Sequence, residues 1–439
     1  MNVIASKPAS RSMDLAGEST PAHPAAEDAP IFVLNCGSSS IKFAWFDGRG
    51  ASPPRAPTWS GQVEGIGGRN PRLLVAGRAP IALTLGRDRP YQAALQAVRT
   101  FVQEQAGGRL PSAVAHRVVH GGSAYAAPVR VDREVLEKLE RYIPLAPLHQ
   151  PLALEAIRVL LDQAPSLPQV ACFDTAFHRT LPQVEQMMAL PHALWERGTR
   201  RYGFHGLSYE YISVALAEHY GDWARGRTIV AHLGSGASLC AMRELQSVAT
   251  TMGFSALDGL MIGTRCGALD PGVVLHLIGR ERYSPERLEH LLYHESGLLG
   301  VSGLSASPKV LLEPEDSHLP ARLALDLYVR RIVREIGALT AVLGGLDMLV
   351  FTAGVGENSA PLRARICLAL GWLRLEIDAD ANRAGLRTLS TAASRVCVVV
   401  EPTNEEWIAA THAQRLIGGR AAAGAAAPPF ARAGANQAA

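Results

Sequence analysis

The sequence is poor in charge, in paired cysteines and in long apolar runs, and each shortage excludes a class of protein. Lys plus Arg total 43 and Asp plus Glu total 40, so the net charge of +3 offers no basic surface of the kind that holds nucleic acid. No apolar run reaches the roughly 20 residues that span a bilayer, and residues 1–30 lack the continuous apolar stretch of a signal peptide. We therefore expect a soluble, cytoplasmic protein that binds neither nucleic acid nor membrane.

The cysteines and the glycine motifs exclude two further kinds of site. All six cysteines stand singly within apolar runs, without a C-x-x-C pair, which predicts reduced core thiols. The P-loop spacing GxxxxGK[ST] is absent, so a Walker-type nucleotide site is excluded. Residues 1–30 and 418–439 have little apolar surface to bury and are predicted to form a disordered leader and a disordered tail.

Two segments repeat the same pattern of strand, Gly-Ser turn and strand. They are IFVLNCGSSSIKFAWFD, which begins at Ile31, and TIVAHLGSGASLCAM, which begins at Thr228. In the first segment Ile41, Phe43 and Trp45 alternate onto one face. The repetition predicts a duplicated α/β fold with an active site in the cleft between its halves. Chance similarity of two Gly-Ser turns is the alternative.

A third segment, DMLVFTAGVGENSAPLRARICLAL, is predicted to run from a buried strand through a glycine loop into a helix. Ser359 is a candidate N-cap for this helix, and Pro361 stands where a first helical turn accepts proline. Residues Leu323 to Leu343 show apolar residues at helical spacing. Strands that alternate with helices favour α/β architecture.

Several polar segments could carry chemistry. Asn35 to Ser40, followed by Lys42, offers backbone N–H groups and hydroxyls at a tight turn, which suits phosphate oxygens, although an ordinary polar hairpin fits as well. Arg117, in the strand-like HRVVHGG, needs an anion or a structural ion pair, because a lone arginine in an apolar strand is costly. The strand also separates its two histidines too far for one zinc ion.

Arg265 lies in a glycine-rich stretch with few other charges, where an arginine can hold a phosphoryl oxygen with two hydrogen bonds. A loop salt bridge to Asp258 or Asp270 is the alternative.

The runs FDTAFH and RYGFHG each place an ionisable residue among aromatics, either as site residues or as a capping Asp and a satisfied core His. The acids Glu405 and Glu406 at a helix start either complement the helix dipole or hold Mg²⁺ through water.

Together these segments resemble the acetate kinases, the acid-phosphorylating branch of the acetate and sugar kinase, Hsp70 and actin superfamily. The motifs are LNCGSSSIK, HRVVHGG, FDTAFH, RYGFHG, GLMIGTR, FTAGVGENS and PTNEE, and the similarity extends from about Ile31 to Leu416. The resemblance implies two RNase H-like (actin-like) domains, 31–175 completed by a helix at 405–417, and 176–404 with the nucleotide site. It also implies reversible transfer between ATP and acetate with Mg²⁺ or Mn²⁺, and a homodimer.

The same resemblance implies roles for individual residues. The catalytic set is Asp174, Arg117, Arg265, His205 and His149. Arg117, Val119, Leu148 and Phe204 match the acetate pocket, and Asn35 and Glu405 match the metal site. The expected ATP contacts are Ser38, Ser40, Lys42, His232, Leu233, Gly234, Ser235, Gly236, Gly354, Val355, Gly356, Glu357 and Asn358.

The chemistry of the implied reaction explains this set. Acetate is already ionised near neutral pH, so its attack on phosphorus needs no general base, and the obstacle is repulsion between two anions. We expect Arg117 to bind acetate and Arg265 to bind the phosphoryl oxygens, with His205 and His149 donating to the same oxygens. Asp174 and Glu405 are expected to hold the Mg²⁺ shell or to orient an arginine.

Three positions depart from the family pattern. Ser235 replaces the amide of HLGNG, Ala268 replaces the acid of GTRCGDxDP, and Ala256 replaces a proline near the acetate pocket. Because alanine is smaller than proline, the acetate pocket could admit one more methylene at Ala256. A propionate or butyrate kinase is therefore the rival interpretation. A rival from another class is an ATP-binding module of the actin or Hsp70 kind without kinase activity.

Overall fold

The chain folds around two β-sheets. The computed structural model describes residues 30–37, 39–48, 52–86 and 88–418. In this part of the chain the first sheet has strand order β5-β4-β3-β2-β1-β6-β8-β7 and the second has order β11-β10-β9-β12-β13. The strands are β1 (Ile31–Cys36), β2 (Ser40–Phe46), β3 (Trp59–Glu64), β4 (Arg72–Val75), β5 (Ile81–Ala82), β6 (Ala113–Val118), β7 (Val129–Arg130), β8 (Gln169–Phe173), β9 (Thr228–Leu233), β10 (Ala237–Arg243), β11 (Gln246–Thr250), β12 (Met348–Thr352) and β13 (Cys397–Val400).

Helices cover both sheets and connect their strands. They are α1 (Pro90–Gln105), α2 (Arg133–Glu140), α3 (Gln150–Gln163), α4 (Gln183–Gln186), α5 (His192–Glu196), α6 (Gly206–Tyr220), α7 (Pro271–Gly279), α8 (Pro285–His294), α9 (Gly297–Ser302), α10 (Pro308–Leu312), α11 (Leu319–Leu343), α12 (Ala353–Asn358), α13 (Ala360–Ala369), α14 (Ala379–Ala384) and α15 (Glu405–Ile417).

The two sheets share one topology. In the first, β3, β2 and β1 form an antiparallel meander, and β6 and β8 extend it in parallel from β1. In the second, β11, β10 and β9 form the same meander, and β12 and β13 extend it in parallel from β9. The two Gly-Ser hairpins occupy equivalent places, β1–β2 and β9–β10. The predicted duplicated α/β fold is therefore confirmed.

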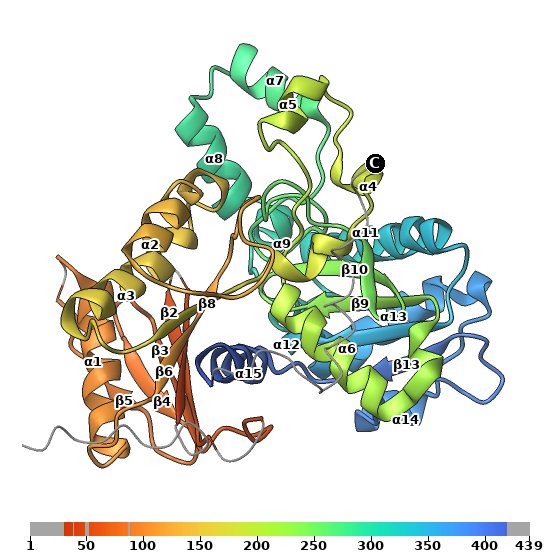
Figure 1. Cartoon of the computed structure of the whole chain (residues 1–439). Helices are drawn as coiled ribbons and strands as arrows, with labels where there is room; N and C mark the ends of the chain where they lie inside the picture. The colour runs from red at the N-terminus through yellow and green to blue at the C-terminus, as the bar shows by residue number, and fades with distance from the viewer. Residues whose placement is uncertain (1–29, 38, 49–51, 87, 419–439) are drawn as a thin grey trace, which may run out of the picture.

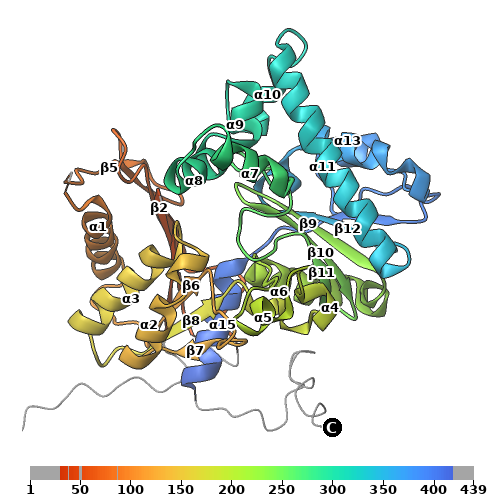
Figure 2. The same cartoon turned by 90° about the horizontal axis from the view of Figure 1, so that it is seen from above.

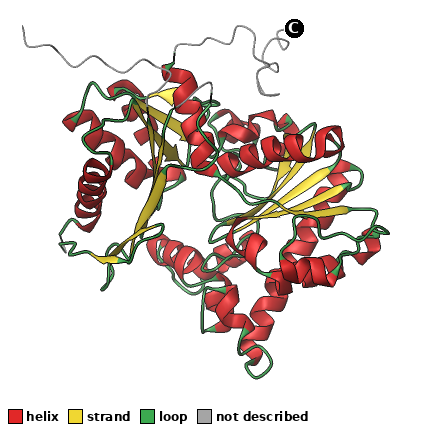
Figure 3. Cartoon of the chain, turned by 90° about the horizontal axis from the view of Figure 1, so that it is seen from below, coloured by secondary structure: helices red, strands yellow, loops and turns green. Residues whose placement is uncertain are grey.

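Two helices lie between the sheets, as Figures 1 and 2 show for α15. On α15, Trp407 and Ile408 pack into the cluster that covers one face of the first sheet. On α6, Leu207 joins that cluster, whereas Tyr209 and Ile212 pack against the second sheet. Figure 3 shows the two sheets with helices around and between them. The predicted site residues His205 and Glu405 stand at the N-termini of α6 and α15, so this arrangement of sheets and helices fixes their positions.

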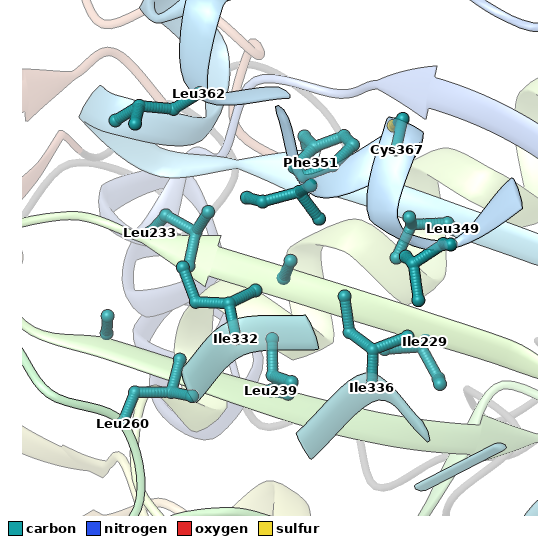
Figure 4. Close-up of a cluster of buried hydrophobic side chains, with 14 of the residues drawn as sticks. Ile229, Leu233, Leu239, Leu260, Ile332, Ile336, Leu349, Phe351, Leu362 and Cys367 are labelled. Atoms are coloured by element: carbon teal, nitrogen blue, oxygen red, sulfur yellow. The ribbon is translucent and has the colours of Figure 1, made fainter. Parts of the chain in front are cut away.

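Strand patterning explains the layers. In β2, Ile41, Phe43 and Trp45 face the cluster that contains α1 and α3, as the alternation predicted. All six residues of β9 are buried, as expected for a central strand covered on both faces. Ile332 and Ile336 of α11, one turn apart, pack over the outer face of the second sheet, where Figure 4 shows them against Ile229 and Leu239.

Some predictions need correction or lie outside the described residues. The segment from Ala353 to Asn358 is a short helix rather than a glycine loop, and Ser359 occupies the N-cap position of α13 without a side-chain hydrogen bond. All six cysteines are free, but Cys266 is only partly buried. The predicted leader and tail fall almost wholly on residues that the structure does not describe.

The proposed limits of the two domains, 31–175 and 176–404, stay a prediction. Each sheet lies within one of these ranges, and α15 packs on the first sheet as the predicted completing helix would. In the part of the chain that the structure describes, no helix is both long and apolar enough to cross a membrane.

Candidate active site

The register of the first sheet brings three polar side chains to one level. Asn35 on β1 is paired with Lys42 on β2 and with Arg117 on β6, and Arg117 is paired with Cys172 on β8. Asp174 follows directly after β8. Since β1, β6 and β8 run in parallel, their carboxyl ends meet at one edge of the sheet, where open α/β sheets bind ligands. The predicted segments LNCGSSSIK, HRVVHGG and FDTAFH therefore meet in space.

Arg117 is held in a fixed orientation by two acids. Its Nε donates to Oδ1 of Asp174 at 2.9 Å and its Nη2 donates to Oδ2 at 2.7 Å, while Nη1 lies 3.2 Å from Oε2 of Glu405. The side chains of Arg117, Asp174 and Glu405 are 21%, 2% and 13% exposed. Burial opposes the charge of Arg117, but the two carboxylates raise the pKa of its guanidinium above the ordinary value. The structural ion pair considered for Arg117 is present, at the edge of the sheet where the other site residues gather.

Arg265 differs, because no carboxylate pairs with it among the described residues. Its Nη1 donates to the carbonyl of Ala256 at 3.3 Å, its Nη2 donates to Nε2 of His149 at 3.3 Å, and it lies 5.9 Å from the ring centroid of Tyr293. Burial lowers the pKa of this guanidinium below the ordinary value. A partly buried cation without an acid is costly unless an anionic ligand meets it.

The salt bridge to Asp258 or Asp270 that was considered for Arg265 does not form. Asp258 instead lies 3.5 Å from Nη1 of Arg201, and Asp270 caps α7 by accepting from the backbone N–H of Gly272. Both acids that stand near Arg265 in the sequence are therefore engaged elsewhere.

Two histidines lie within the fields of both arginines. Burial, and after it the charges of Arg265 and Arg117, lower the pKa of His149 to about 4. The pKa of His205 is also far below its ordinary value, first through burial and then through the neighbouring His232 and the same two arginines. The structure thus gathers Arg117, Arg265, His149 and His205, although they come from four separate segments. At neutral pH both histidines are uncharged hydrogen-bonding groups.

His205 occupies the N-cap position of α6 in the left-handed conformation, with φ 57°. Its Nδ1 lies 2.8 Å from Oγ of Ser238. Its ring stacks on that of His232, with centroids 4.2 Å apart and planes 16° apart. By contrast, His178 of the FDTAFH run is a core residue, because Ser247 and the carbonyl of Phe204 satisfy both of its ring nitrogens.

The glycine segments of the second sheet also meet at one edge. Thr352 at the end of β12 is paired with His232 near the end of β9. The turn Gly234 to Gly236 follows β9, with Ser235 exposed, and α12 follows β12, with Gly354 and Asn358 exposed. Ser235, Gly354 and Asn358 are thus accessible to a ligand, whereas His232, Leu233 and Gly356 are buried and Val355 is partly buried. Glu357 instead accepts from the backbone N–H groups of Ala353 and Thr403.

The remaining predicted residues lie around this centre. Val119 follows β6 and Leu148 precedes α3, both partly exposed, whereas Phe204 is buried beside His205. Of the predicted phosphate contacts on the first hairpin, Ser38 lies outside the described residues. The carbonyl of Ser40 accepts from the backbone N–H of Gly37 at 2.8 Å. Lys42 lines a cavity of about 490 Å³ together with Asn404 and Glu406.

Sequence reasoning missed Ser238, which contacts His205, and the carbonyl of Ala256, which contacts Arg265. Ser238 carries a signal in the sequence, because it is a hydroxyl in the otherwise apolar run ASLCAM of a central strand. The carbonyl of Ala256 carries none, because every residue has one.

Residues 30–411 match the model of the acetokinase family. The chain belongs to the acetokinase family. It is 46% identical over 395 residues to the acetate kinase of Rhodopseudomonas palustris. The aligned region covers 89% of this chain and 98% of that protein. It is 47% identical over 394 residues to the acetate kinase of Rhizobium meliloti, covering 88% of this chain and 98% of that protein.

Solved structures of the same family share the fold. The chain superposes on Porphyromonas gingivalis acetate kinase with a TM-score of 0.78 at 34% identity, covering 89% of this chain and 100% of that one. A propionate kinase from Francisella tularensis gives a TM-score of 0.81 at 33% identity, with 88% and 98% covered. As a member of the acetokinase family, the chain is a kinase, a phosphotransferase whose acceptor is a carboxyl group.

Proposed function

We propose that this enzyme transfers the γ-phosphoryl group of ATP to acetate, giving ADP and acetyl phosphate, and catalyses the reverse reaction. A carboxylate oxygen of acetate forms the new bond to phosphorus, and the bond to the bridging oxygen of ADP breaks. The observation that carries the proposal is Arg265, a partly buried cation with no acidic partner in the described structure, which lowers the pKa of the same two histidines as Arg117, an arginine that two acids hold in place.

The protonation states support transfer without a general base. Acetate is ionised near pH 7, and the low pKa values of His149 and His205 leave both rings neutral. What the site must supply is compensation for the repulsion between a carboxylate and a polyphosphate. Arg117 binds the acetate carboxylate and Arg265 binds the transferred phosphoryl group, while His205 donates a hydrogen bond to one of its oxygens.

His149 acts in part through Arg265. Its Nε2 accepts from the guanidinium, so this nitrogen orients the arginine and only Nδ1 is left to donate. The apolar side chains of Val119, Leu148 and Phe204 enclose the methyl group of acetate. ATP lies along the exposed backbone of the turn Gly234 to Gly236 and of α12, with Ser40 and Lys42 on the side of the phosphates.

We also propose that Asn35 and Glu405 hold Mg²⁺. The residues fit such an ion: Oε1 of Glu405 and the side-chain amide of Asn35 have no hydrogen-bond partner in the described structure, and carboxylate and amide oxygens are ligands that Mg²⁺ accepts. When bound, the ion supplies positive charge to the phosphate oxygens. Asp174 uses both carboxylate oxygens on Arg117 and therefore orients that arginine.

The pKa of Glu405 makes Mg²⁺ dependence sensitive to pH. Burial raises this pKa above its ordinary value, although Arg117 opposes the increase. Because a protonated carboxyl cannot bind the ion, the Mg²⁺ concentration needed for half-maximal rate should increase as the pH decreases toward this raised pKa. Glu405→Gln should need more Mg²⁺ at every pH and should lose the pH dependence. An unchanged profile in this variant would remove Glu405 from the metal site.

The chain is proposed to act as a homodimer. All nine residues of α7 are at least partly exposed, and Val273, Leu275 and Ile278 are 40%, 70% and 44% exposed. Such an apolar helix on the surface favours association with a second copy. Sedimentation should give a mass of twice 46.8 kDa.

Trapping of the acyl phosphate tests the function. With ATP, Mg²⁺ and acetate, hydroxylamine should capture acetyl phosphate as the hydroxamate, in an amount that matches the ADP formed. An ATP-binding module without kinase activity would bind nucleotide and give no hydroxamate.

Ala256 is expected to set the tolerance for propionate. Its carbonyl contacts Arg265, so this residue lies next to the arginine that we propose to hold the transferred group. One methylene in an apolar pocket is worth about 1 to 3 kcal/mol, and Ala256→Pro should lower kcat/KM for propionate relative to acetate by about tenfold or more. Equal ratios in the variant and the parent would separate this position from acyl specificity.

A further inference from the structure

Hydrogen bonds link three buried side chains in a row that ends at the ring of His205. The hydroxyl of Tyr209 lies 2.5 Å from Oγ of Ser238, and that Oγ lies 2.8 Å from Nδ1 of His205. Tyr209 and Ser238 are fully buried and His205 is 9% exposed. Tyr209 comes from α6 and Ser238 from β10, so these hydrogen bonds join α6, whose N-cap is His205, to the central part of the second sheet.

The number of available acceptors decides which group donates in each of these two hydrogen bonds. In the described structure the hydroxyl of Tyr209 has Ser238 as its hydrogen-bond partner and no other, so Tyr209 must donate to Oγ of Ser238 to satisfy its own proton. The single proton of Ser238 is then free to donate to Nδ1 of His205. Nδ1 must accept, and the ring proton of His205 lies on Nε2.

The opposite arrangement leaves a buried proton unpaired. Suppose that Nδ1 of His205 carried the hydrogen and donated to Ser238. The hydroxyls of Ser238 and Tyr209 would then have one hydrogen bond between them, which uses only one of their two protons. Leaving a buried donor without a partner costs more than a typical hydrogen bond contributes. The linked hydrogen bonds of Tyr209 and Ser238 therefore select one tautomer of His205.

The neighbouring His232 is held in the same way. Its Nδ1 lies 2.8 Å from Oγ of Ser208, and its ring stacks on that of His205. A Cβ atom built on Gly236 would lie 2.8 Å from Nε2 of His205, and one built on Gly234 would lie 3.6 Å from Nε2 of His232. Both Nε2 atoms thus face the glycine turn that we propose as part of the nucleotide site.

We propose that Ser238, held by Tyr209, is a positioning residue that fixes His205 in the Nε2–H tautomer and aims this N–H at an oxygen of the transferred phosphoryl group. The inference rests on the proposed function. A neutral histidine can either donate or accept through Nε2, and a phosphoryl oxygen only accepts. The wrong tautomer would present a lone pair to the developing negative charge.

The charge state of His205 makes its tautomer decisive. Burial lowers the pKa of its ring most, followed by the charges of His232 from β9, Arg117 from β6, Arg265 and His178, and none of these groups is an acid. The ring therefore stays neutral across the working pH range, and its contribution depends on which nitrogen carries the single proton.

The test compares Ser238→Ala with the parent enzyme. We expect kcat to fall by about 10- to 100-fold, the range seen when partners that orient a functional histidine are removed, with KM values for ATP and acetate changed less than about threefold. Nitrogen-15 NMR of the histidine rings should show part of the His205 population moving to the Nδ1–H form. Tyr209→Phe should cause a smaller loss of kcat and a partial shift of the same kind.

Ser247→Ala is the matched control. Ser247 is also fully buried and lies 2.8 Å from Nδ1 of a histidine, His178, but the carbonyl of Phe204 fixes the tautomer of that ring through Nε2. This variant removes a comparable hydroxyl and should keep kcat, so it separates positioning from a general loss of packing.

Two results would overturn the proposal, and they differ from failure of the proposed function. If Ser238→Ala keeps kcat within about twofold, or if His205 keeps the Nε2–H form in this variant, Ser238 does not position His205. If the parent enzyme forms no acyl phosphate while the tautomer still changes in Ser238→Ala, the function fails and the role in catalysis fails with it.

Discussion

Arg265→Ala is expected to lower kcat for acetyl phosphate formation by about 10³- to 10⁵-fold, the effect of removing an arginine that stabilises a phosphoryl transition state. The reason is the absence of an acid beside Arg265 in the described structure, so that the substrate itself must complete its environment. The exposed backbone of the glycine turn and of α12 is unchanged in the variant. The Kd for ATP, measured by calorimetry, should therefore change less than about fivefold.

Arg287→Ala serves as the control for this variant. Arg287 also lies over a tyrosine ring, 5.3 Å from the centroid of Tyr283, but it is 44% exposed and pairs with Glu295. Its removal should leave kcat unchanged. Near-normal turnover by Arg265→Ala, or a loss of ATP binding as large as the loss of turnover, would contradict the role assigned to Arg265.

Arg117→Ala is expected to lower kcat/KM for acetate by about 10²- to 10³-fold, the effect of removing a preorganised donor that meets the charge of the reacting groups. Asp174 holds the guanidinium through two hydrogen bonds and Glu405 through an ion pair, so that Arg117 presents a fixed charge to the acceptor carboxylate. The ATP site that we propose lies mainly on the second sheet, so the KM for ATP should be nearly unchanged.

Arg227→Ala tests whether loss of an arginine and aspartate pair is enough to cause this effect. Arg227 forms the same two-bond contact, with Asp347, but both side chains are more exposed, and the pair lies at the start of β9, away from the site. Its kcat/KM for acetate should match the parent. Thermal melting of Arg117→Ala and Arg117→Lys distinguishes loss of fold from loss of function, and full activity in Arg117→Lys would refute the need for a forked guanidinium.

The repeated hairpins predicted the fold because their patterns reflect burial. The all-apolar β9 and the alternating β2 each follow from how many faces of the strand are covered, and the sequence displays this directly. The glycine segment after β12 was predicted as a loop and forms α12. Glycine weakens a helix in isolation, but Glu357 stabilises this one by accepting from the backbone of Ala353 and Thr403.

The partners of the arginines could not be predicted from spacing. Asp258 and Asp270 are the nearest acids to Arg265 along the chain, yet one lies beside Arg201 and the other caps a helix. Arg117 pairs with Glu405, which comes from the far end of the chain, because α15 packs against the first sheet. Hydrogen-bond partners depend on side-chain orientation after packing, which local sequence does not encode.

Binding of a transition-state mimic tests the central claim, that Arg117 and Arg265 together offset the repulsion between two anionic reactants. The affinity of ADP, aluminium fluoride and acetate for the Mg²⁺-loaded enzyme can be measured by calorimetry beside the affinity for ATP. Arg265→Ala and Arg117→Ala should each weaken binding of the mimic by about the same factor as they lower kcat/KM, with ATP affinity nearly unchanged. If both variants bind the mimic as tightly as the parent, the arginines do not stabilise the reacting groups and the account is wrong.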